Sequence, residues 1–153
     1  MSYPYKIPKL IDINAKSRLI RGKDSLLIIG RCVEVEHPRV LEEFLSSGRY
    51  AVVSVCLEEE HVNHVGLKLA GVLARSSYRE VAVLTVDGSL HCVQLHHMVE
   101  EVFKVMGIEG RVARKHYVIE DGKVIEVSSR AVKVSRYLSK VDKLLRLSKQ
   151  STK

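Results

Sequence analysis

The sequence predicts a three-layer α/β domain with a mainly parallel sheet, because apolar strand segments alternate with amphipathic helices along the chain. Three continuous apolar runs, typical of strands buried on both faces of a sheet, cover residues 25–30, 50–57 and 80–86. Helical patterns separate these runs, and we expect right-handed crossovers between the parallel strands. A chain of 153 residues is long enough for one core that buries roughly 70% of the unfolded surface.

Each predicted helix has its own boundary signals. Pro38 suits the first turn of a helix, because it lacks the N–H group that would be unpaired there. Gly48 is suited to end that helix in a left-handed conformation. The three glutamates Glu58–Glu60 are predicted to open the next helix, since carboxylates favour the positive end of the helix dipole. A third helix is expected from about Leu90 to Met106.

The pattern changes in the last third of the chain. Residues 112–120 and 123–128 are strand-like and flank Asp121-Gly122, a strong signal for a two-residue hairpin turn. One of the two serines Ser128-Ser129 is predicted to cap a final amphipathic helix. The apolar stripe of that helix consists of Val134, Tyr137, Leu138, Val141, Leu144 and Leu145. The whole pattern therefore predicts a Rossmann-like fold that is completed by a C-terminal β-hairpin and helix.

We expect a single α/β domain over residues 24–148, with an N-terminal arm (1–23) and a disordered tail (149–153). No apolar run approaches the roughly 18 residues that span a membrane, and the N-terminus lacks the apolar stretch of a secretory signal. The three scattered cysteines are not typical of a disulfide framework, so a cytoplasmic location is expected. Scarce Asn and Gln beside plentiful Lys, Arg and Glu are a bias of thermophile proteins.

The net charge of +7 is concentrated at the two ends of the chain. Residues 130–153 hold eight basic side chains and one acid, whereas residues 32–60 hold two basic side chains and seven acids. A basic final helix predicts, as one alternative function, binding of nucleic acid or an acidic partner that weakens steeply with salt. A merely solvated face is the more ordinary interpretation. The apolar stripe of the helix predicts either core packing or the seam of a homo-oligomer.

Side chains suited to chemistry follow the ends of the three predicted parallel strands. Ligands of open α/β sheets bind in the crevice beyond the carboxyl ends of the strands. All three cysteines and four of the seven histidines fall in these segments. The candidate metal ligands are Cys32, Cys56, Cys92, His61, His64 and His96. Because zinc or iron suits such ligands, the leading prediction is a module that binds a metal or a small anionic ligand, with a redox-linked role.

The strand-to-helix turn Asp87-Gly88-Ser89 is the most specific of these segments. Gly88 is suited to a positive φ, and Ser89 is suited to cap the helix that follows. Free backbone N–H groups at such a helix start hold anions. The residues expected to bind an anionic ligand are Gly30, Arg31, Gly88 and Ser89. A turn and a cap without a ligand is the simpler interpretation.

Cys92 supports a second function, that of a cysteine-dependent enzyme. It lies in the first turn of a predicted helix, where the helix dipole lowers the thiol pKa and favours the thiolate. Cys92 would then be the nucleophile, with His91 or His96 as its base. Asp87 would orient that base or accept a proton. Simple core packing is the alternative for Cys92 and for Cys56, since free cysteine is among the most buried residue types.

Residues 84–96, with the sequence Leu-Thr-Val-Asp-Gly-Ser-Leu-His-Cys-Val-Gln-Leu-His, resemble a stretch in small proteins of archaea and anaerobic bacteria. The likeness extends through Glu58–His64, and some of those proteins carry iron–sulfur or ferredoxin-type labels. The resemblance implies an iron–sulfur centre that joins Cys32, Cys56 and Cys92 with a histidine or another group as fourth ligand. However, the chain lacks the Cys-x-x-Cys spacing of ferredoxins and the glycine motifs of nucleotide sites. The sequence leaves open whether the protein is an enzyme.

Overall fold

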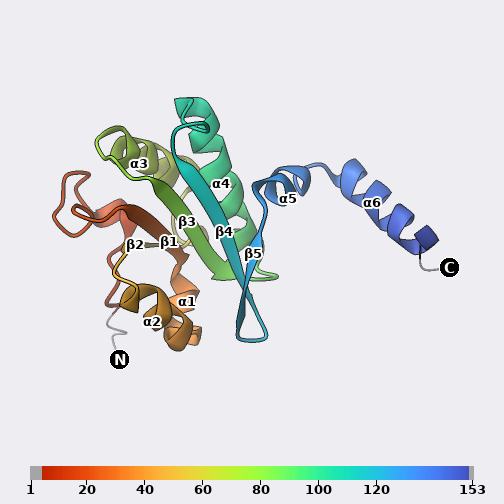
Figure 1. Cartoon of the computed structure of the whole chain (residues 1–153), viewed down its shortest axis with the longest axis horizontal. Helices are drawn as coiled ribbons and strands as arrows, with labels where there is room; N and C mark the ends of the chain where they lie inside the picture. Colours follow the sequence, from red (N-terminus) through yellow and green to blue (C-terminus); the bar gives the residue numbers. More distant parts are fainter. Residues whose placement is uncertain (1–4, 152–153) are drawn as a thin grey trace.

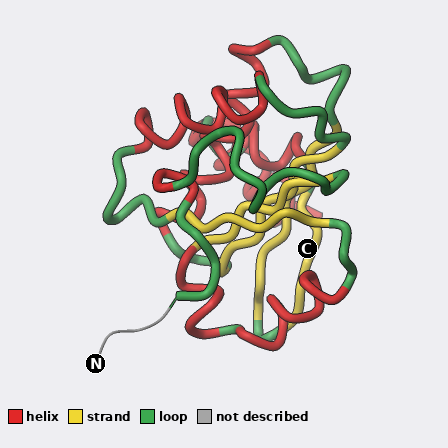
Figure 2. Tube along the Cα trace, turned by 90° about the vertical axis from the view of Figure 1, so that its left-hand side faces the viewer, coloured by secondary structure: helices red, strands yellow, loops and turns green. Residues whose placement is uncertain are grey.

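A five-stranded sheet in the order β2-β1-β3-β4-β5 forms the centre of the computed structural model, which describes residues 5–151 (Figure 1). Four strands run parallel: β1 (Ser25–Gly30), β2 (Tyr50–Val55), β3 (Glu80–Val86) and β4 (Ala113–Glu120). The last strand, β5 (Lys123–Val127), pairs antiparallel with β4. Helices lie on both faces of the sheet, so the predicted three-layer α/β fold is confirmed (Figure 2).

Alternate residues of the central strands enter two separate apolar layers. Leu26 and Ile28 of β1 pack with α3 (Val62–Ala74) and α4 (Leu90–Met106) on one face. Their neighbours Leu27 and Ile29 pack with α1 (Arg31–Glu36) and α2 (Pro38–Ser46) on the other face. Both faces of β1 are therefore covered, which explains why its sequence is a continuous apolar run.

The C-terminal hairpin has the turn that the sequence predicts. Asp121 and Gly122 have φ values of 49° and 73°, so both central residues of the turn are left-handed. A turn of this kind matches the twist of the flanking strands. The hairpin places β5 at one edge of the sheet, whereas β2 lies at the opposite edge.

Two boundaries on the β2 side differ from the sequence prediction. The glutamates Glu58–Glu60 form a turn and do not open a helix, because α3 begins only at Val62. The N-cap of α3 is His61, whose Nδ1 accepts a hydrogen bond from the backbone N–H of Asn63 at 3.1 Å. The structure also contains α1, a six-residue helix that is too short to give a periodic signal in the sequence.

The predicted final helix is divided into two helices. Ser128 caps the first, α5 (Ser129–Val134), by accepting a hydrogen bond from the N–H of Ala131 at 3.0 Å. The second, α6 (Leu138–Ser151), extends away from the sheet (Figure 1). No residue from Leu138 to Lys149 is buried, so the apolar stripe of α6 is not part of the core.

The predicted N-terminal arm packs against the domain. Four of its side chains are buried: Ile7, Leu10, Ile13 and Ile20. A short 3₁₀ helix, η1 (Leu10–Asp12), lies within it. Of the predicted disordered tail, residues 149–151 continue α6, and residues 152–153 lie outside the described residues. Among the described residues, no helix combines the length and apolarity that crossing a membrane requires.

Candidate functional site

A pocket of about 130 Å³ lies at the carboxyl ends of β1, β2 and β3. The residues that line it include Gly30, Arg31 and Cys32 after β1, Cys56, Leu57 and Glu58 after β2, and Ser89, His91, Cys92 and Leu95 after β3. All three cysteines of the chain therefore meet at this pocket. Parallel pairing of the strands brings them together, although up to sixty residues separate them in sequence.

Cys32 and Cys92 form a close thiol pair at this pocket. Their Sγ atoms are 3.9 Å apart, within hydrogen-bond range for sulfur. Cys32 lies in the first turn of α1, and Cys92 lies in the first turn of the seventeen-residue helix α4. Cys92 is buried and Cys32 is half-buried, and both are free thiols. The two thiols therefore share one environment at the starts of two helices.

The surroundings of the pair favour the thiolate form of Cys92. A hydrogen bond from Cys32 is the largest of the effects that lower the pKa of Cys92 to about 6. The Ser89 side chain, the backbone at Val86 and the charge of His91 lower this pKa further, and together these effects outweigh burial. The same hydrogen bond, together with burial, raises the pKa of Cys32. Cys32 therefore keeps its proton and donates a hydrogen bond to the Cys92 sulfur.

Gly30 leaves just enough room for the thiol pair. A Cβ atom at this position would lie 3.3 Å from Cys92 Sγ, 3.6 Å from Thr85 Cγ2 and 3.7 Å from Cys32 Sγ. The φ angle of Gly30 is −63°, so any residue could adopt its backbone conformation. Space beside the sulfur atom is therefore the reason for a glycine at the end of β1.

Arg31, predicted to bind an anion, is paired with two glutamates of the same chain. Its guanidinium pairs with Glu59 and donates to both carboxylate oxygens of Glu60, at 2.8 and 3.2 Å. Both Arg31 and Glu60 are largely buried, and Glu60 also accepts the backbone N–H of Cys56 at 3.0 Å. The glutamate turn therefore anchors the start of α1. The Nε atom of Arg31 is buried without a hydrogen-bond partner.

The histidines near the pocket have separate surroundings. His91 Nδ1 lies 3.3 Å from Glu58 Oε1 at the pocket rim. His61 and His64 lie side by side at the start of α3, with ring centroids 5.4 Å apart, and both are exposed. His96 lies one turn after Cys92 on α4 but is buried elsewhere, in contact with Thr85.

The predicted metal ligands do not assemble into one centre. Among residues 5–151, no group of three or more His, Cys, Asp or Glu side chains is arranged to hold a metal ion. Cys56 lines the same pocket, but it does not complete a group of three ligands with the two close sulfur atoms. His96 is engaged in other hydrogen bonds, and His61 caps α3. The described side chains therefore fit neither zinc, which takes at least three protein ligands, nor an iron–sulfur cluster, which takes four.

The Asp87-Gly88-Ser89 turn contributes one residue to the pocket. Gly88 has a φ of 88°, as the turn requires, but it is exposed and does not line the pocket. Ser89 occupies the N-cap position of α4, but its side chain makes no cap hydrogen bond and instead interacts with Cys92. The exposed Asp87 lines a different pocket, beside His96 and His97, so it is not placed to assist Cys92.

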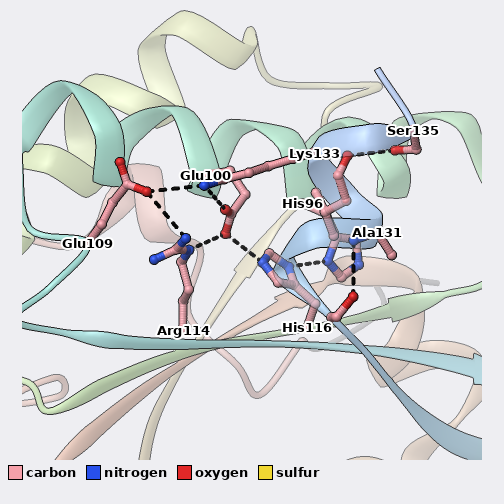
Figure 3. Close-up of polar contacts among 10 residues, drawn as sticks. His96, Glu100, Glu109, Arg114, His116, Ala131, Lys133 and Ser135 are labelled. Atoms are coloured by element: carbon pink, nitrogen blue, oxygen red, sulfur yellow. Dashed lines mark hydrogen bonds and ion pairs between the residues drawn. The ribbon is translucent and has the colours of Figure 1, made fainter. Parts of the chain in front are cut away.

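A second group of polar side chains is buried between α4 and the sheet (Figure 3). His96 Nε2 lies 2.8 Å from Thr85 Oγ1, and its Nδ1 lies 2.8 Å from Nδ1 of His116. His116 Nε2 lies 2.8 Å from Glu100 Oε2, to which Arg114 Nε donates at 2.6 Å. The sequence predicted a functional role only for His96 in this group. One signal for His116 is its position within β4, a strand whose other residues are mostly half-buried or exposed.

Both histidines of this buried group are neutral at neutral pH, because burial lowers their pKa values. With both rings neutral, His116 Nε2 donates to the Glu100 carboxylate, and Nδ1 of His116 accepts a hydrogen bond from His96 Nδ1. His96 Nε2 then accepts from the Thr85 hydroxyl. Burial lowers the pKa of His96 to about 3 and also lowers the pKa of His116. The group therefore stabilises the packing of α4 rather than supplying an acid at neutral pH.

The comparisons with known proteins agree with this architecture. The model of a family described as a Rossmann-like domain matches residues 19–151. The chain belongs to the Rossmann-like domain family. Neither the curated proteins nor the solved structures gave a match. In this Rossmann-like domain, the cysteine pocket occupies the edge where ligands of open α/β sheets bind.

Proposed function

We propose that this Rossmann-like domain is a cysteine-dependent redox protein whose Cys92 and Cys32 cycle between a dithiol and a disulfide. The observation that carries the proposal is the 3.9 Å separation of the two Sγ atoms, with the thiolate favoured at Cys92. A disulfide has an S–S length of about 2.05 Å, so its formation requires the sulfur atoms to approach by about 2 Å. Rotation of the half-buried Cys32 side chain supplies this movement.

The substrate class that fits the site is a small peroxide. The pocket has a volume of only about 130 Å³, and Cys92, which lines it, is buried, which favours a small electrophile over a large one. A thiolate is the reactive form of cysteine towards such electrophiles. The polar groups of Ser89 and His91 beside Cys92 are positioned to stabilise the charge on sulfur.

The proposed reaction has two steps. In the first, the Cys92 thiolate attacks one peroxide oxygen, so an S–O bond forms, the O–O bond breaks, and the leaving oxygen takes up a proton as an alcohol or water. In the second, Cys32 sulfur attacks the Cys92 sulfenic acid, so the disulfide forms and water leaves with the Cys32 proton. The two sulfur atoms together supply the two electrons that reduce the peroxide. An external dithiol returns the disulfide to the dithiol form.

The test is oxidation of the reduced protein by one equivalent of hydrogen peroxide, followed by intact-mass measurement and peptide mapping. We expect the mass to fall by two hydrogen atoms and the disulfide to join Cys32 and Cys92. Cys92→Ala should abolish the reaction, and Cys32→Ala should stop it at a sulfenic acid that dimedone traps. Cys56→Ala is the matched control, since Cys56 lines the same pocket outside the close pair. Unchanged oxidation of Cys92→Ala would contradict the proposal.

A second candidate function, binding of a small anion at the same pocket, is favoured by one observation. Arg31 is buried, lines the pocket and has an Nε without a hydrogen-bond partner. The start of α4 adds unpaired backbone N–H groups of the kind that hold anions. Phosphate or sulfate should then protect Cys92 from alkylation with a saturable dependence, and the absence of protection would leave only the thiol chemistry.

A further inference from the structure

The helix α6 carries an apolar face that nothing in the described part of its own chain covers. Leu138, Val141 and Leu145 recur at spacings of three and four residues, so they share one side of the helix. Leu138 is 80% exposed and Leu145 is 60% exposed. Large apolar side chains that are exposed along one side of a helix usually mark an interaction surface. The opposite side of α6 is basic, because the helix holds four basic residues and one acid.

A groove of matching chemistry lies at the other end of the molecule. We call it the α2 groove; it has a volume of about 300 Å³, and its lining includes the apolar residues Ile7, Val35, Leu41 and Leu45 and the charged residues Lys6, Glu34 and Glu42. Val35 and Leu45 are 37% and 38% exposed, although both are large apolar side chains. Glu34 accepts the backbone N–H groups of Lys6 and Ile7 through Oε1, and its Oε2 has no hydrogen-bond partner. The groove is therefore mainly apolar, with two acidic residues and one basic residue among its lining.

The positions of α6 and the α2 groove make contact within one chain difficult. The groove lies between the N-terminal segment, α1 and α2, and α2 packs against β2 at one edge of the sheet. The helix α6 follows α5, which packs against α4 and β4 towards the other edge. Figure 1 shows α2 and α6 at opposite ends of the molecule. A second copy of the chain can present its α6 without this constraint.

We propose that α6 of one copy docks into the α2 groove of a second copy of this chain. An amphipathic helix in an apolar groove is a common recognition mode, in which residues at i, i+3, i+4 and i+7 supply the contacts. The charges agree with this pairing, because α1 and α2 carry four glutamates and two basic residues, one of which, Arg31, is paired with Glu59 and Glu60, whereas α6 is basic. A reciprocal exchange, in which each copy's α6 occupies the groove of the other, closes the assembly as a two-fold dimer.

The test is sedimentation of the full chain and its variants over a range of concentrations. Leu144→Gln with Leu145→Gln keeps good helix formers but removes part of the apolar stripe, and we expect the dissociation constant to rise at least tenfold. Ser139→Gln on the opposite side of α6 is the matched control and should leave association unchanged. On the groove side, Leu45→Lys should weaken association to a similar degree, because a cation then faces the basic helix.

Mixing the two defective chains identifies the occupant of the groove. A chain with Leu45→Lys still has an intact α6, and a chain with Leu144→Gln and Leu145→Gln still has an intact groove, so their mixture should associate through one restored contact. If Leu45→Lys associates as well as the wild type, the α2 groove is not the docking site and the proposal is overturned. It is equally overturned if the wild-type chain stays monomeric over the whole concentration range, and binding of duplex DNA or anionic vesicles by that monomer would identify another partner for α6.

Discussion

The Nδ1 atoms of His96 and His116 lie 2.8 Å apart, so one of the two rings must donate a proton to the other. In the neutral state Glu100 sets the direction of this hydrogen bond, because its carboxylate accepts from His116 Nε2 and leaves His116 Nδ1 as the acceptor. A proton added to His116 Nδ1 would face the His96 donor, and His96 would have to change its tautomer. Proton binding therefore competes directly with this buried group.

Stability should decrease as the pH falls below neutrality. The pKa of His96 is lowered from 6.5 to about 3 by burial, and the pKa of His116 is lowered as well. Between these values the unfolded chain binds protons that the folded chain does not, so the free energy of unfolding declines from pH 6.5 towards pH 3. Each such histidine contributes a slope of about 1.4 kcal/mol per pH unit. Urea unfolding of wild type and His96→Gln at several pH values measures this, and the variant should show the shallower slope.

Removing the thiol of Cys32 should raise the pKa of Cys92. In the wild type this pKa is lowered to about 6, and the hydrogen bond from Cys32 is the largest cause. The rate of alkylation by iodoacetamide should therefore rise through pH 6 in the wild type and only at higher pH in Cys32→Ala. Cys56→Ala should retain the wild-type profile. Identical profiles for the wild type and Cys32→Ala would show that the hydrogen bond does not control the thiolate.

Gly30→Ala should disturb the thiol pair without straining the backbone. The added Cβ would lie 3.3 Å from Cys92 Sγ, so the sulfur atom must shift by a few tenths of an ångström. We expect slower formation of the disulfide and a loss of about 1–2 kcal/mol from the free energy of unfolding. Gly110→Ala is the control, because a Cβ there meets nothing within 4 Å. Equal effects of the two substitutions on disulfide formation would count against the role assigned to Gly30.

Arg31→Met should destabilise the fold more than a surface substitution does. The change leaves the Glu60 carboxylate, which is largely buried, without its guanidinium partner. Removing one partner of a buried ion pair costs about 3–5 kcal/mol. The double variant Arg31→Met with Glu60→Gln should recover a substantial part of this loss, as thermal or urea unfolding would reveal. If the double variant lost the sum of the stabilities that Arg31→Met and Glu60→Gln each lose alone, the two side chains would be acting independently.

The sequence predicts the fold better than it predicts the site. β1 and β3 have the predicted residue bounds because burial on both faces leaves a continuous apolar run, and α4 has them because burial of one face leaves a helical period. The pocket depends instead on which strands are neighbours, and the order β2-β1-β3 is not encoded in any local pattern. The glutamate turn illustrates the difficulty, since Glu60 pairs with Arg31 from a separate strand end. The hydrogen-bond partners of His116 could likewise not be predicted, because His96 and Glu100 belong to α4, a separate element.

The place of β1 in the sheet has a consequence for how the chain reaches its folded state. Among the strands of this sheet β1 comes first along the chain, but its partners begin at residues 50 and 80, whereas the β4–β5 hairpin is local. Pairings that close long loops are slow, because the chain loses entropy before the contacts compensate for it. Until β3 joins β1, Cys92 cannot meet Cys32, and both remain ordinary thiols. The acidity of Cys92 is therefore acquired late, as a product of folding itself, and a growing or partly folded chain does not possess it.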